Sequence, residues 1–182
     1  MSDSLILIIA IVLAAILMFI VPLMSISERN DDITQLAVQT ATSDFVETAT
    51  TKGKITQDDY SAFVQTLAAT GNTYEIEMEV QVIDENFGKK SASTSGDLIG
   101  ENSYFSVYTS TIEDKFREQA EAPTPVKNPV YPLKQGDNFI VTVKNTNKTI
   151  AQLLRGFFYT VAGNDTYQVA ASYSSTVTSN GN

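Results

Sequence analysis

The hydrophobic residues are distributed unevenly along the chain, and the longest apolar run lies near its start. The segment from Leu5 to Met24 reads LILIIAIVLAAILMFIVPLM and contains no charged residue. A helix of about twenty residues spans roughly 30 Å, which is the thickness of the hydrocarbon core of a bilayer. The pattern therefore predicts a transmembrane helix.

The residues around this run predict an anchor that stays on the protein. A cleavable signal peptide has a basic first region, a shorter apolar stretch and a small-residue cleavage site. Residues 1–4 (MSDS) contain no Lys or Arg, and the sequence SISERNDD after Met24 offers no such site. We expect a transmembrane segment at 1–25 and one extracytoplasmic domain at 26–182. Arg29 alone lies close to the anchor, so charge does not determine this topology.

Pro22 lies near the end of the apolar run and removes one hydrogen bond from the helix. Two interpretations are open. The proline is either tolerated near the membrane surface, where water reaches the freed carbonyl, or it forms a flexible joint between the anchor and the domain.

The helical pattern continues beyond the anchor as an amphipathic stripe. Apolar or small residues recur at spacings of three and four, at Ile33, Leu36, Ala37, Thr40, Ala41, Phe45, Val46 and Ala49. The polar face is expected to carry Asp31, Asp32, Gln35, Gln39, Ser43 and Glu47. Gly53 is the first strong breaker and a good helix end. The anchor and this segment are therefore expected to form one helix of about fifty residues.

A second, shorter helix is predicted to begin at Thr56. Its hydroxyl and a carboxylate three residues later match a capping pattern, and Tyr60, Phe63, Val64 and Leu67 give an apolar face. The adjacent Asp58 and Asp59 resemble an acid/base pair. Their position in a first helical turn instead favours interaction with the helix dipole.

Three segments alternate between apolar and polar residues and predict strands. They are Tyr74–Val82, Phe139–Val143 and Tyr167–Val177. We expect these strands in one antiparallel sheet, with their apolar faces on the helix that bears Leu36 and Phe45. The fold class is therefore α+β.

The remaining segments give weaker patterns. Residues 84–102 are loop-like, and 104–119 are ambiguous at their start but have Tyr108, Ile112 and Phe116 at helical spacing. Residues 122–132 are rich in proline and are expected to be extended and irregular. A short helix is expected from Thr149, and a turn at Gly163.

Glu75, Glu77 and Glu79 form a row along the first strand and suggest two interpretations, a calcium site or a solvated face. Residues on one face of a strand stand about 6.8 Å apart, too far for one compact site without ligands from loops. The pattern favours the solvated face.

Composition limits the chemistry of the chain. It has 12 Lys and Arg against 21 Asp and Glu, a net charge of -9, which disfavours binding to nucleic acid. The sequence contains no Cys, His or Trp, so disulfides and Cys/His zinc sites are excluded. No nucleophile or phosphate-binding motif is present, and we expect no enzymatic activity, cofactor, metal or small-molecule substrate. The glycosylation triplets at Asn147 and Asn164 fit cap and turn roles better.

The order of elements resembles the type IV pilin fold. The segments TKGKITQDDYSAFVQTLAATGNTYEIEMEV and QGDNFIVTVKN resemble the pilin-like minor subunits of Gram-positive bacteria, related to the tight-adherence group. The resemblance implies a long helix under an antiparallel sheet, and an apolar half-helix that moves from membrane to filament core. It also implies that Pro22 lets the helix melt on assembly. The chain departs from the family in lacking a basic leader that ends in Gly, and Leu5 stands where a glutamate is expected.

These features lead to the hypothesis of a structural subunit at the cell surface, in a pilus-like filament or in its membrane-anchored initiating complex. Its partners would be the bilayer and copies of itself or other pilin-like subunits. The alternative is a monomeric anchored binding module of a secretion or conjugation apparatus. Ala10 and Ala14 lie four residues apart and form a small-xxx-small pair, which lets helices approach closely, or are simply good helix formers. The residues expected to form the membrane and assembly surface of the apolar helix are Leu5, Ile9, Ala10, Ala14, Ala15, Phe19 and Pro22.

Overall fold

The computed structural model describes residues 2–83, 104–147 and 170–181 of the chain. The described elements follow one another in this order: α1 Ser2–Lys52, β1 Lys54–Thr56, α2 Gln57–Ala68, β2 Tyr74–Ile83, β3 Tyr104–Tyr108, α3 Thr109–Ala120, β4 Val130–Pro132, β5 Asn138–Asn145 and β6 Ala170–Thr176. The long apolar helix and the small antiparallel sheet confirm the α+β layout. The expected loop at 84–102, helix from Thr149 and turn at Gly163 lie outside the described residues.

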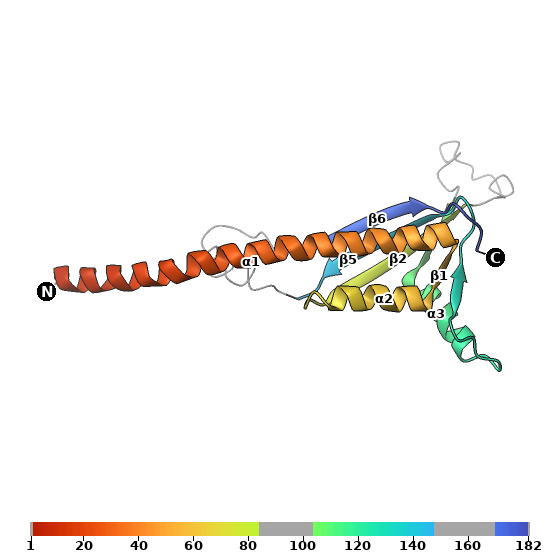
Figure 1. The fold of residues 1–182 in the computed structure, drawn as a ribbon, viewed down its shortest axis with the longest axis horizontal. Coiled ribbons are helices and arrows are strands. Elements are labelled where there is room, and N and C mark those ends of the chain that lie inside the picture. Colours follow the sequence, from red (N-terminus) through yellow and green to blue (C-terminus); the bar gives the residue numbers. More distant parts are fainter. Residues whose placement is uncertain (1, 84–103, 148–169, 182) are drawn as a thin grey trace, which may run out of the picture.

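A single helix, α1, joins the apolar segment to the domain. It runs for 51 residues and continues through Pro22. Its first part projects beyond the described part of the domain, and its second part lies along the sheet (Figure 1). It ends at Lys52, and Gly53 follows with φ of 67°. Only glycine adopts this left-handed conformation without strain, which explains why the helix ends there.

Among the described residues, the main sheet has four strands in the order β3-β2-β5-β6, and each neighbouring pair is antiparallel. The three strands predicted from alternation are β2, β5 and the described part of the last segment, β6. The ambiguous segment at 104–119 resolves into a strand, β3, followed by a helix, α3, which buries Ile112 and Phe116. The proline-rich segment was expected to be irregular but contains a strand, β4. This strand pairs with β1 in a two-stranded sheet.

The core lies between α1, α2 and the inner face of the main sheet. Phe45 of α1 occupies its centre, because its ring stacks on Phe63 of α2 at 4.6 Å between centroids and meets Phe139 of β5 edge-on at 5.9 Å. Met78, Val80, Val141 and Val143 complete the sheet side and are fully buried. Burying these side chains supplies the main stabilisation of the domain.

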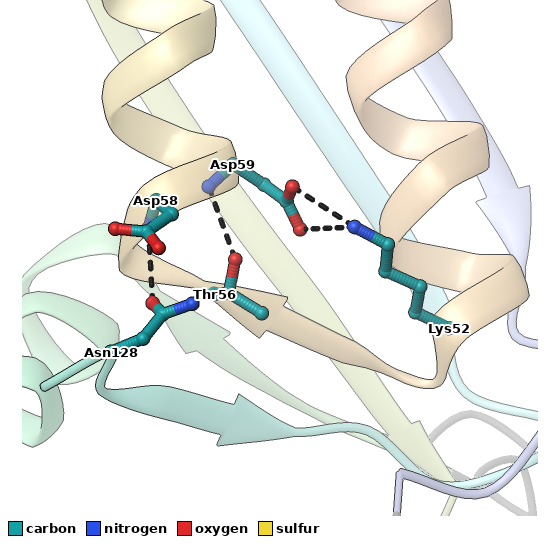
Figure 2. A network of polar contacts seen from close by, with 5 residues as sticks. All are labelled: Lys52, Thr56, Asp58, Asp59 and Asn128. Atoms are coloured by element: carbon teal, nitrogen blue, oxygen red, sulfur yellow. Dashed lines mark hydrogen bonds and ion pairs between the residues drawn. The ribbon is translucent and has the colours of Figure 1, made fainter. Parts of the chain in front are cut away.

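A polar network fastens the end of α1 to the start of α2 (Figure 2). Thr56 is the N-cap of α2, and its Oγ1 accepts the Asp59 backbone N–H at 3.1 Å. The Nζ of Lys52 contacts both carboxylate oxygens of Asp59, at 2.8 and 3.0 Å. Asn128 accepts the backbone N–H of Asp58 through its Oδ1 at 3.2 Å. Asp58 and Asp59 are therefore part of a helix cap, as the sequence favoured.

The cap predicts a pH dependence of stability. Partial burial raises the pKa of Asp59, but hydrogen bonds and charge attraction from Lys52, together with Thr56, outweigh it and leave the pKa below its usual value. The stabilisation is therefore present above about pH 4, the unfolded value, and is lost as the pH falls through the folded pKa. Urea unfolding of Asp59→Asn should show a loss of about 1 kcal/mol at pH 7.

The same measurements at pH 3 should show a smaller difference between Asp59→Asn and the unmodified chain. Asp44→Asn, at an exposed position of α1, controls for the loss of one negative charge. A difference that stays constant from pH 7 to pH 3 would contradict the role of the Asp59 carboxylate.

Candidate assembly surface on helix α1

One helix in the described part of the chain is long and apolar enough to cross a membrane, and it is α1. Its most apolar 18-residue window has a mean hydropathy of 3.3, and none of that window is buried against the rest of the protein. An apolar surface of this length and exposure is compatible with a membrane anchor.

The residues predicted for the assembly helix all lie on this exposed part of α1. Leu5, Ile9 and Phe19 are more than half exposed. The alanines at 10, 14 and 15 are exposed too. Ala10 and Ala14 share a face because they are one helical turn apart. The structure therefore leaves both open to a neighbouring helix.

Beyond the anchor, the structure corrects the expected orientation of the helix. The side that packs on the domain carries Asp31, Thr34, Val38, Thr42, Phe45, Val46, Ala49 and Thr50. Phe45, Val46 and Ala49 were assigned to the core correctly. Ile33, Leu36, Ala37 and Thr40 were expected on the same stripe but are exposed, Ile33 at 61% and Leu36 at 64%. Asp31, expected on the polar face, is buried.

The corrected orientation has a physical basis in the buried threonines. The Thr42 hydroxyl donates to the carbonyl of Val38 at 2.7 Å, and the Thr50 hydroxyl donates to that of Val46 at 2.8 Å. A hydroxyl bonded within its own helix can be buried without losing a hydrogen bond to water. The buried side can therefore contain threonine, and the larger apolar residues are left for the exposed side.

The large apolar residues of α1 that are exposed beyond the apolar run Leu5–Met24 are Ile26, Ile33 and Leu36, which we call the outer stripe. Ala15, Pro22, Ile26 and Ile33 follow one another at intervals of seven, four and seven residues, so they lie along one face. The outer stripe therefore continues the exposed face of the apolar run along the part of α1 that packs on the domain. The sequence also contains the pattern of the buried side. Positions 31, 34, 38, 42, 45 and 49 are spaced as regularly as the predicted stripe that includes Ile33 and Leu36.

A hydrogen bond joins α1 to β6 at the border of the side of α1 that the sheet covers. Tyr173 Oη donates to Glu47 Oε1 at 2.9 Å. This bond to a carboxylate raises the pKa of Tyr173. The contact holds β6, the outermost of the described strands on that side of the sheet, against α1, and the outer stripe lies on the uncovered side of the helix.

The glutamate row on β2 and the glycosylation triplets at Asn147 and Asn164 were the other candidate sites in the sequence. The described residues of these sites contact neighbouring parts of the protein. Glu77 forms an ion pair with Lys144 at 3.0 Å, and Glu79 accepts a hydrogen bond from Ser106 at 2.6 Å. Within residues 2–83, 104–147 and 170–181, no group of three or more acidic side chains is placed to hold a metal ion. Asn147 bonds to the Thr73 backbone N–H and to the Asn72 side chain. Asn164 lies outside the described residues.

Comparisons with protein families, curated proteins and solved structures found no match. The exposed apolar face of α1 is therefore the feature from which a function can be argued.

Proposed function

We propose that the protein is a non-enzymatic, single-pass membrane subunit of a type IV pilus-like filament, or of the anchored complex that initiates one. In this proposal the domain lies outside the membrane, and association between helices is the function. The observation that carries the proposal is the outer stripe. An anchor alone needs apolar surface only across the bilayer, but here exposed apolar residues continue to Leu36.

The position of the outer stripe suits contact between subunits. The sheet and α2 cover the opposite side of α1, so a neighbouring helix can approach along the exposed side (Figure 1). Lipid tails provide little hydrophobic force between helices, so association within a bilayer needs close packing at small residues. Ala10 and Ala14 would supply that packing in the membrane, and the outer stripe, which lies on a different face of the helix, would add a second contact outside the membrane.

Cross-linking in intact cells tests the proposal. The unmodified protein should give a ladder of bands above the monomer on immunoblots. Ala14→Phe should abolish the ladder, because a bulky ring keeps neighbouring helices apart, while the amount of protein in the membrane stays the same.

Ile16→Phe is the matched control. Residues two apart on a helix point in nearly opposite directions, so this ring is added at the same depth on the other side. It should leave the ladder intact. Absence of any ladder for the unmodified protein would refute the filament proposal and favour a monomeric anchored module.

A further inference from the structure

The edge of β2 that faces β3 is only partly paired. β3 pairs with Glu79–Ile83, whereas β5 pairs with Tyr74–Gln81 on the other side. Within the described residues, no strand pairs with Tyr74–Glu77 on the side of β3. An unpaired strand edge presents N–H and C=O groups to which another extended chain can bond.

Thr109 shows which backbone groups face this open edge. It follows β3 directly, and its Oγ1 accepts the Met78 backbone N–H at 2.7 Å and donates to the Met78 carbonyl at 3.3 Å. The hydroxyl therefore takes the place of a paired strand at Met78. Backbone direction alternates along a strand, so the N–H and C=O of Ile76 point to the same side as those of Met78.

A cleft of about 360 Å³ opens beside the middle of β2, at the point where the chain leaves β3. It is lined on one side by Tyr108, Thr109 and Ser110, and on the other by Glu77 and Glu79, with Thr142 on β5. Tyr108 is 59% exposed, so much of its side chain is accessible. The cleft thus joins an open strand edge to an aromatic ring and two carboxylates.

The charge of this surface selects the kind of chain that fits. Glu75, Glu77 and Glu79 alternate along β2 on the face away from α1, where Lys144 is the basic residue that pairs with Glu77. On an added strand, the Cβ atoms of the residues opposite these glutamates would stand about 5 Å from the glutamate Cβ atoms, so long basic side chains could reach the carboxylates. Opposite charges at that distance stabilise a strand pair, and a cation over the ring of Tyr108 adds to the attraction.

We propose that the open edge of β2 binds an extended segment of a partner protein that carries Lys or Arg at alternate positions. The segment adds as a strand beside Tyr74–Glu77, bonds to the backbone of Ile76, and places its basic side chains near Glu75 and Glu77. Its outermost cation reaches the cleft beside Tyr108. This mode of recognition combines backbone bonds for affinity with side-chain positions for selectivity. It does not depend on association through α1.

The test uses the full chain in neutral detergent micelles and the synthetic peptide acetyl-Thr-Lys-Val-Lys-Val-Lys-Thr-amide. Titration should show saturable binding, and amide hydrogen exchange at Ile76 should slow at least tenfold in the complex. Replacing the three lysines of the peptide by glutamate should weaken binding at least tenfold. The same loss is expected when alternate peptide nitrogens are methylated, because the donors to the Ile76 carbonyl are then removed.

Two variants separate this site from general attraction to an acidic protein. Glu75→Lys reverses an exposed charge beside the edge and should weaken binding at least tenfold. Glu121→Lys makes the same change at the exposed end of α3 and should leave binding within twofold. The proposal is overturned by equal losses in both variants, by unweakened binding of the methylated peptide, or by unchanged exchange at Ile76.

Discussion

Gly53→Ala is expected to destabilise the domain by at least about 3 kcal/mol, more than any other glycine substitution at a positive φ in the described chain. A Cβ at this position would lie 2.3 Å from the Ser179 carbonyl oxygen, 2.6 Å from the Gly181 nitrogen and 2.7 Å from the Asn180 carbonyl carbon. All three are backbone atoms and cannot rotate away. The left-handed conformation adds a cost of about 1–2 kcal/mol for any residue with a Cβ.

The segment 177–181 would be displaced in this variant, and its bonds would be lost with it. Thr178 donates its backbone N–H to the carbonyl of Thr50 at 3.1 Å, and Gly181 donates to that of Leu133 at 3.3 Å. The first of these bonds satisfies a carbonyl at the end of α1 that has no partner within the helix.

Gly71→Ala is the matched control, because Gly71 also has a positive φ, of 80°, but a Cβ there meets no atom within 4 Å. It should cost only the conformational part, about 1–2 kcal/mol. Urea unfolding of the full chain in micelles, followed by tyrosine fluorescence, measures both. Equal losses in the two variants would show that the contact with 177–181 contributes nothing.

Two aspartate substitutions, two residues apart on α1, are expected to differ strongly in their effect on stability. Val38→Asp should unfold the domain, because Val38 is fully buried and an unpaired carboxylate in the core costs about 4 kcal/mol or more. Leu36→Asp should change the free energy of unfolding by less than about 0.5 kcal/mol, because Leu36 is exposed. The same urea titration measures both.

The Leu36→Asp variant also tests whether neighbouring subunits contact one another through the outer stripe. If neighbouring subunits pack there, a charge at this position should remove the cross-linked ladder while the folded domain remains. Ser43→Asp, at a half-buried position farther along α1, controls for the added charge. A ladder that survives Leu36→Asp would exclude the outer stripe from the contact between subunits.

The sequence predicted well those elements that have a clear local pattern, such as strands with alternating residues and the helix with the long apolar run. The helix through Pro22, its end at Gly53, the cap at Thr56 and the three alternating strands all follow from local chemistry that a few neighbouring residues determine. β1 and β4 were not predicted because each has three residues, too few to show a period. Their pairing depends on a contact between segments more than seventy residues apart.

The side of α1 that packs on the sheet could not be predicted for a different reason. Two stripes on this helix have regular spacing, and the correct one contains Thr34, Thr42 and Thr50. The pattern alone favours the more hydrophobic stripe, with Ile33 and Leu36. Only the position of the sheet decides between them, so the candidate assembly surface became visible in the structure.

The bonds between α1 and residues 177–181 determine when the domain can be completed during synthesis. Thr178 follows Thr50 by 128 positions, and β6, which lies against α1, is synthesised after every other described strand. The apolar part of α1 is therefore available to the membrane while the carbonyls at its other end still lack their partners. Contacts this distant in sequence form slowly, because a long loop must close first. If α1 is the proposed anchor, it can therefore enter the bilayer before the domain is complete, and the domain would then fold on a helix that is already held there.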